Sequence, residues 1–120
     1  MAVDEMTQAR YEARAKVIKA LAHATRLYIV DQIAEGERCV CELTEKIGAD
    51  MSTVSKHLTV LKDAGVVCAE KRGLQVFYRL RVPCVLNLFG CIEGVLRANA
   101  DAQMACIAPV GGAGRQEPQG

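Results

Sequence analysis

Apolar residues recur every three to four positions through most of this 120-residue chain, which is the spacing of amphipathic helices. The pattern predicts helices over residues 7–21, 25–35, 40–47, 51–64 and 83–104. Thr25 can cap the second of these helices, and either Asp50 or Ser52 can cap the fourth. Glycines at positions 36, 48 and 65 follow the predicted helix ends, where a left-handed residue commonly stops a helix.

Two β-rich runs interrupt the helical pattern, at Val66–Glu70 and Gln75–Leu80. Gly73 lies between them and can supply the positive φ of a tight hairpin turn. The helices over 40–47 and 51–64, joined through Gly48, have the arrangement of a helix-turn-helix, and a basic hairpin directly behind them is typical of a wing. The predicted fold class is therefore mainly α with a small β-hairpin, a winged helix-turn-helix.

The predicted final helix carries a strong apolar stripe, and such a face on a small domain needs a partner surface. The stripe consists of Val85, Leu88, Phe89, Ile92, Val95 and Leu96. A second copy of the chain is the simplest partner, so we expect a homodimer formed through the terminal helices. We assign residues 1–106 to one winged helix-turn-helix domain with dimerisation helices and expect a disordered, glycine- and proline-rich tail over 107–120.

Charge and composition limit the class of protein further. The net charge is only +1, but residues 52–81 carry a net +4 and the remainder −3, a distribution suited to a selective DNA-binding protein. No apolar run approaches the length of a membrane span, and the acidic N-terminus is unlike a signal peptide. We therefore expect a cytoplasmic protein without membrane contact, in which six cysteines favour metal or redox chemistry over disulfides.

Cys39-Val40-Cys41 is the cysteine pair with the strongest chemical signal, since two thiolates one residue apart favour soft metal ions. Side chains two residues apart lie about 200° apart around a regular helix but share a face in extended backbone. Chelation therefore requires residues 38–41 to be non-helical or an unwound helix start. Arg38 and the positive end of the following helix could favour the thiolate form.

These motifs together resemble the ArsR/SmtB family of metal-responsive winged-helix repressors over about residues 10–100. The resemblance is carried by Ala22–Leu27, Cys39–Leu43, Ser52–Val67, Arg72-Gly73 and Tyr78–Leu80. It implies a homodimer that binds a palindromic operator when metal-free and releases it on metal binding. Cys-Val-Cys is similar to the arsenic-type and cadmium/lead-type members, which makes arsenic(III) the expected inducer, with other soft thiophilic ions also accommodated.

A complete arsenic(III) site needs a third thiolate, and the resemblance indicates where it is missing. Arsenic-type members often carry that cysteine at the position held here by Thr44. The third ligand is then either missing or supplied by Cys68, Cys84, Cys91 or Cys106. Cys68 is the one most expected to be a buried or idle thiol, so Cys84, Cys91 and Cys106 together with Cys39 and Cys41 form the candidate metal set. A cadmium/lead-responsive or thiol-redox-responsive repressor of the same fold remains the alternative. The last helix has no histidine, which disfavours a zinc site there.

The DNA-facing residues should lie on the second helix of the helix-turn-helix and on the wing. The candidates are Ser52, Thr53, Ser55, Lys56, His57, Thr59, Lys62 and Arg72. The hydroxyls can contact base edges or phosphates, the lysines phosphates, and Arg72 a minor groove or phosphate. A cysteine-dependent enzyme is the rival class. We expect no enzymatic activity, because His57 belongs to the recognition helix and His23 is far from Cys39 in sequence.

Overall fold

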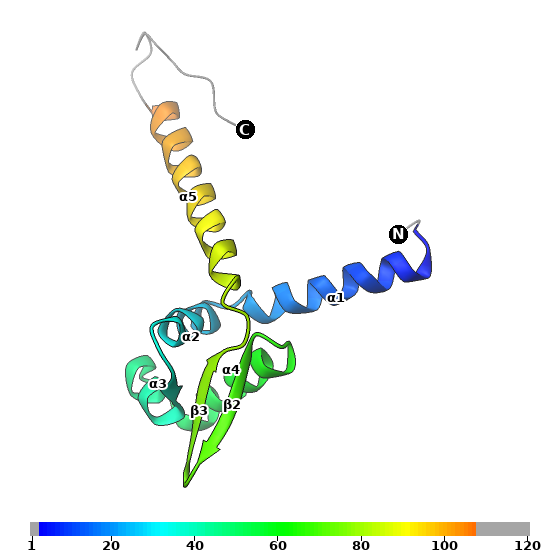
Figure 1. The fold of residues 1–120 in the computed structure, drawn as a ribbon. Helices are drawn as coiled ribbons and strands as arrows, with labels where there is room; N and C mark the ends of the chain where they lie inside the picture. The colour runs from blue at the N-terminus through cyan, green and yellow to red at the C-terminus, as the bar shows by residue number, and fades with distance from the viewer. Residues whose placement is uncertain (1–2, 108–120) are drawn as a thin grey trace. The chain divides into compact units, whose positions relative to one another are not determined.

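The computed structural model describes residues 3–107, which form five helices and one three-stranded sheet (Figure 1). In chain order the elements are α1 (Glu5–Leu21), α2 (Ala24–Ala34), β1 (Arg38–Cys39), α3 (Val40–Ile47), α4 (Met51–Asp63), β2 (Val67–Arg72), β3 (Gln75–Leu80) and α5 (Val85–Ile107). The chain divides into two compact units, one up to Pro83 and one from Cys84 onwards. The mainly helical class with a small antiparallel sheet is confirmed.

The first unit is built around the helix-turn-helix formed by α3 and α4. Its fully buried side chains come from α2, α3, α4, the start of β2 and the residue before it, namely Ile29, Val30, Leu43, Val54, Leu58, Leu61, Val66 and Val67. The buried face of α4 consists of Val54, Leu58 and Leu61, which are spaced three to four positions apart. Gly48 ends α3 in the left-handed region, at φ 79°, which lets the chain turn directly into α4.

Two helix starts test the predicted caps. The Asp50 carboxylate accepts a hydrogen bond from the Thr53 backbone N–H at 2.8 Å, so Asp50 caps α4. The prediction that Thr25 caps α2 is wrong, because His23 holds that position and its Nδ1 accepts from the Thr25 N–H at 3.1 Å. An imidazole can replace the usual hydroxyl or carboxylate only when Nδ1 is unprotonated.

The sheet contains a strand that the apolar pattern did not predict. Its order is β1-β3-β2, with β1 and β2 both antiparallel to β3. The register pairs Cys39 with Phe77, and Phe77 with Glu70. Because directly paired residues point to the same face of a sheet, Cys39, Phe77 and Glu70 form one row across all three strands.

Helix α1 packs through its C-terminal end, where Ala20 and Leu21 are buried, and most of its length has no partner in the unit (Figure 1). Val17 and Ile18, which the pattern placed on an apolar face, are exposed in the single chain.

The second unit is described by α5, a helix that begins at Val85, two residues later than the predicted start at Pro83. Its apolar stripe includes Leu88, Ile92, Val95 and Leu96, all exposed in the single chain. The helix still contains Ile107, which was assigned to the tail, and residues 108–120 lie outside the described part. No helix within residues 3–107 has the length and hydropathy needed to span a bilayer.

Candidate functional site

The Cys39-Val40-Cys41 pair lies at the junction between β1 and α3. Cys39 has extended backbone (φ −87°, ψ 162°) and is 6% exposed, whereas Cys41 is the second residue of α3 and is exposed. The expected non-helical backbone therefore extends only through Cys39, since the helix already begins at Val40. The two thiols differ in access, because only Cys41 is open to a solute from outside.

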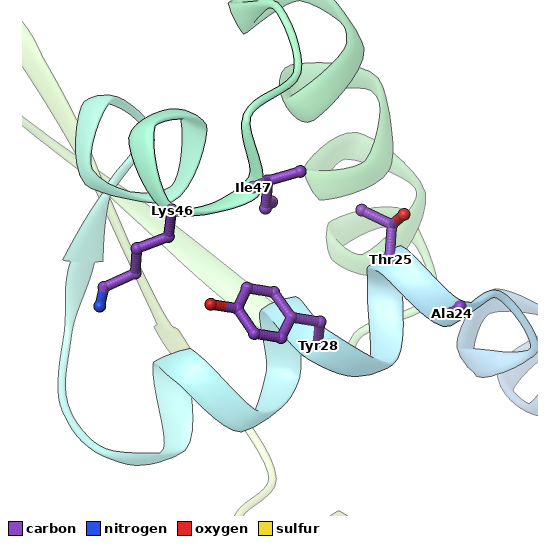
Figure 2. A pocket seen from close by; sticks show the side chains of 5 residues that line it. All are labelled: Ala24, Thr25, Tyr28, Lys46 and Ile47. Carbon is purple, nitrogen blue, oxygen red and sulfur yellow. The ribbon is translucent and has the colours of Figure 1, made fainter.

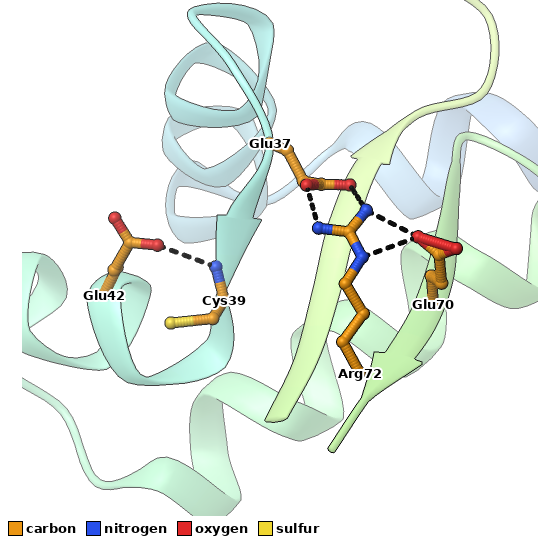
Figure 3. A network of polar contacts seen from close by, with 5 residues as sticks. All are labelled: Glu37, Cys39, Glu42, Glu70 and Arg72. Atoms are coloured by element: carbon orange, nitrogen blue, oxygen red, sulfur yellow. Dashed lines mark hydrogen bonds and ion pairs between the residues drawn. The ribbon is translucent and has the colours of Figure 1, made fainter. Parts of the chain in front are cut away.

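Cys39 is the N-cap of α3 and shares a reciprocal contact with Glu42 (Figure 3). Its backbone N–H donates to Glu42 Oε1 at 3.0 Å, and its sulfur faces the Glu42 backbone N–H. Burial raises the pKa of the Cys39 thiol. The hydrogen bonds with Cys39 lower the pKa of the Glu42 carboxyl. In this conformation Cys39 is therefore a protonated, protected thiol.

Arg38 does not activate this thiol, contrary to the sequence prediction. Its guanidinium donates to the Gln32 carbonyl at 3.3 Å and to Glu35 at 3.3 Å, and it lies 3.8 Å from Glu42. The positive charge is thus matched by neighbouring oxygens, and the pKa of Cys39 is raised rather than lowered, with burial as the largest cause.

The other candidate ligands belong to the second unit. Cys84 and Cys91 are exposed, and Cys106 lies in α5 at a position whose side chain is not described. Within residues 3–107 no group of three His, Cys, Asp or Glu side chains is gathered closely enough to hold a metal ion. In this part of the chain the Cys39-Cys41 pair therefore has no third such donor beside it.

Thr44 occupies the position of the missing third cysteine, on α3 one turn beyond Cys41. Its hydroxyl oxygen is buried and has no hydrogen-bond partner among the described residues. Buried hydroxyls are normally hydrogen-bonded, so this one is an unfavourable feature of the fold.

Helix α4 exposes most of the predicted DNA-facing residues. Thr53, Lys56 and Lys62 are exposed, and Ser55 is half-buried. Two hydroxyls already have local acceptors: Ser52 donates to the Asp50 carboxylate at 3.0 Å, and Thr59 donates to the Ser55 carbonyl at 2.9 Å. The outward positive charge of this helix is carried by its two lysines.

His57 is half-buried and packs against side chains of the fold, so its place in the DNA-facing set stays a prediction. Its ring lies 4.5 Å from the His23 ring, centroid to centroid, and its Nδ1 lies 3.2 Å from Arg26 Nη1. Burial lowers the pKa of His57, and electrostatic interactions with His23 and Arg26 lower it further. The imidazole is a packing element that joins α4 to the start of α2.

Arg72, at the end of β2, uses most of its guanidinium N–H groups for contacts within the protein. Its guanidinium forms two 2.7 Å hydrogen bonds with the Glu37 carboxylate and further hydrogen bonds with Glu70 (Figure 3). These contacts raise the pKa of the arginine further above its usual value. Sequence reasoning missed Glu37 as the partner, because β1 was not predicted and nothing local links residues 37 and 72.

A shallow groove of about 400 Å³ lies between α2 and α3 (Figure 2). It is lined by Ala24, Thr25, Tyr28, Lys46 and Ile47, and it brings together no cysteine, histidine or carboxylate. The groove does not contribute to the thiol site or to the recognition helix.

Comparison with known proteins identifies the family. Residues 23–68 match the model of the bacterial regulatory protein, arsR family. Over 91 residues, 76% of this chain, the sequence is 44% identical to the HTH-type transcriptional repressor SmtB of Mycobacterium tuberculosis, of which it covers 66%. It is 37% identical over 86 residues to the arsenic resistance transcriptional regulator ArsR1 of Pseudomonas putida, covering 71% of this chain and 67% of that protein.

A solved structure gives the same result for the fold. The solution structure of a homodimeric winged helix-turn-helix DNA-binding domain from Mycobacterium bovis has a TM-score of 0.72 at 33% identity, with 85% of this chain and 95% of that chain covered. The winged helix-turn-helix prediction is confirmed, and the relatives are transcriptional regulators rather than enzymes. The chain is a member of the ArsR family of bacterial regulatory proteins.

Proposed function

We propose that this chain is a homodimeric transcriptional repressor that binds operator DNA in the cytoplasm and releases it when arsenic(III) binds its cysteines. The observation that carries the proposal is the position of Cys39 and Cys41 at the N-terminus of α3, the first helix of the DNA-binding pair. A ligand held there acts directly on the element that supports the recognition helix.

The DNA-binding part rests on the exposed face of α4. Thr53 and Lys56 lie in its first two turns, the part of a recognition helix that reaches base edges in the major groove. Lys62 supplies a phosphate contact one to two turns further on. Duplex DNA is thus the partner proposed for this surface.

Dimerisation is supported by apolar side chains that the single chain leaves in water. They are found on both terminal helices and include Tyr11, Val17 and Ile18 on α1 and Leu88, Ile92, Val95 and Leu96 on α5. Exposed apolar surface of this extent marks an interface in a small domain. We propose that a second copy of the chain covers it, as the M. bovis relative is described as homodimeric.

The proposed binding of arsenic(III) rests on the different accessibility of the Cys39 and Cys41 thiols. Cys41 is accessible and can make the first contact, while Cys39 must leave its buried position and lose its proton before it can act as a ligand. Soft ions bind thiolates strongly and release protons as they do so. A third sulfur from Cys84, Cys91 or Cys106 would complete the set.

The test uses the duplex that the protein itself selects from a randomised DNA library. Release of that duplex by arsenite, cadmium and zinc is measured for wild type and for single Cys→Ser variants. Cys39→Ser keeps a good helix cap, because serine is a preferred N-cap residue. Cys68→Ser is the matched control, since that cysteine is half-buried in β2 and lies outside the proposed metal set.

We expect arsenite to release the duplex from wild type and from Cys68→Ser alike. It should not release the duplex from Cys39→Ser or Cys41→Ser. Loss of response in one of Cys84→Ser, Cys91→Ser or Cys106→Ser would identify the third ligand. An unchanged arsenite response in both Cys39→Ser and Cys41→Ser would overturn the proposed site. Release by cadmium but not by arsenite would replace the proposed inducer with the cadmium/lead alternative.

A further inference from the structure

Arg72 is held by two carboxylates in the DNA-free protein. Its Nη1 and Nη2 donate to the two oxygens of Glu37 at 2.7 Å each, and its Nε donates to Glu70 Oε1 at 2.8 Å. With the additional Nη2 contact to Glu70, four of the five guanidinium N–H groups are used. An arginine in this state has almost no donor left for a phosphate.

The direction of the side chain agrees with this pairing. Arg72 runs from the end of β2 back along the hairpin toward Glu37, away from the turn that follows it (Figure 3). Its guanidinium carbon also lies 4.8 Å from the centre of the Phe77 ring. Phe77 is the strand partner of Cys39, so one face of the sheet carries both the arginine cluster and the buried thiol.

The charge of the cluster opposes DNA binding as long as it is closed. One guanidinium between two carboxylates leaves a net charge of −1 on this cluster, so the cluster itself repels a phosphate backbone. Lys71 and Arg79 keep the β2–β3 hairpin as a whole positive. Carboxylate and phosphate both bind arginine through the same bidentate geometry, so they compete for the same N–H groups. The pair can exchange, because the Arg72 side chain is 47% exposed and the Glu37 side chain 29% exposed.

We propose that Glu37 is an internal counter-ion that competes with DNA phosphate for Arg72, so that the wing contributes to DNA affinity only when this ion pair opens. This inference rests on the DNA-binding half of the proposed function and is independent of the inducer.

The experiment measures binding of the library-selected duplex by the inducer-free full chain at several salt concentrations. Glu37→Gln removes the competing charge, and Glu35→Gln is the matched control. Glu35 lies two residues away and pairs with Arg38 rather than Arg72. We expect Glu37→Gln to bind at least roughly threefold more tightly at 50 mM salt than Glu35→Gln, with a log K against log salt slope steeper by about 0.9, the value of one added phosphate contact.

A second substitution separates release of Arg72 from simple loss of negative charge. Adding Arg72→Gln to Glu37→Gln should abolish the gain and return the salt slope to the wild-type value. A gain that persists without Arg72, a Glu37→Gln affinity equal to that of Glu35→Gln, or weaker binding by Glu37→Gln would each overturn the inference. Failure of wild type to bind any duplex would instead overturn the proposed function itself.

Discussion

Thr44 is the position at which the structure makes the sharpest prediction about stability. Its buried hydroxyl has no hydrogen-bond partner, and such a group costs a protein about 1–3 kcal/mol. Thr44→Val replaces the hydroxyl with a methyl group of nearly the same size, and both residues are β-branched with similar helix propensity. We expect Thr44→Val to raise the free energy of unfolding by about 1 kcal/mol, which corresponds to about 4 °C in Tm.

Urea unfolding of wild type and Thr44→Val at one fixed protein concentration measures this difference, because the stability of a dimer depends on concentration. The m-value should not change, so the effect should appear in the midpoint alone. Thr44→Ser is the control, since it keeps the hydroxyl and loses a methyl group, at a cost of about 0.8 kcal/mol. If Thr44→Val were less stable than wild type, the hydroxyl would have a partner in solution and the reasoning would be wrong.

Thr44→Cys tests whether position 44 can supply the third thiol of the arsenic(III) site. Residues 41 and 44 are three apart on α3, and side chains at that spacing are neighbours on a helix surface. Removal of the unpaired hydroxyl should roughly offset the lost methyl group, so the variant should unfold at nearly the wild-type midpoint. We expect arsenite to bind it more tightly, and the binding to become independent of Cys84, Cys91 and Cys106. Unchanged arsenite affinity would show that position 44 does not face the site.

The remaining predictions concern the core, the histidine cluster and the recognition helix. Leu58 is fully buried, so Leu58→Ala should destabilise the fold by about 2–5 kcal/mol in urea unfolding, and a loss under 1 kcal/mol would contradict its core position. His57 has a lowered pKa in the fold, so its protonation favours the unfolded chain. Stability should therefore fall as pH drops from 7 through 6.5 toward 5.5, and His57→Gln should flatten that decline, whereas an equally steep decline would exclude His57 as its source. Lys56→Ala should weaken duplex binding and reduce the salt slope by about 0.9 without changing the unfolding midpoint, and an unchanged slope would remove Lys56 from the phosphate contacts.

Most of the fold could be predicted because local patterns decide it. The predicted helix over 40–47 has the observed bounds, and Gly48 and Gly73 stand at the expected turns, because helical period and positive-φ glycine are properties of a few consecutive residues. Strand β1 was missed because two residues are too short for any periodicity. It exists because its backbone pairs with β3, which is about 40 positions away in sequence.

The site was predictable in its residue types but not in its environments. Only Val40 separates Cys39 from Cys41, yet one is buried as a helix cap and the other is exposed, and the junction of β1 with α3 makes that difference. His57 and Arg72 were both assigned to DNA by their place in a motif. In the fold they contact His23 and Glu37, which lie more than thirty positions away, beyond the reach of local pattern.

The cap formed by Cys39 has an evolutionary consequence. Serine, threonine, aspartate and asparagine all meet the backbone requirement of an N-cap at least as well as cysteine does, so the start of α3 does not depend on sulfur. A lineage could therefore lose the thiol, or regain it, without disturbing the helix or the DNA-reading surface behind it. Inducer chemistry and operator recognition can diversify separately in such a scaffold, each through exchanges of single side chains on an unchanged backbone.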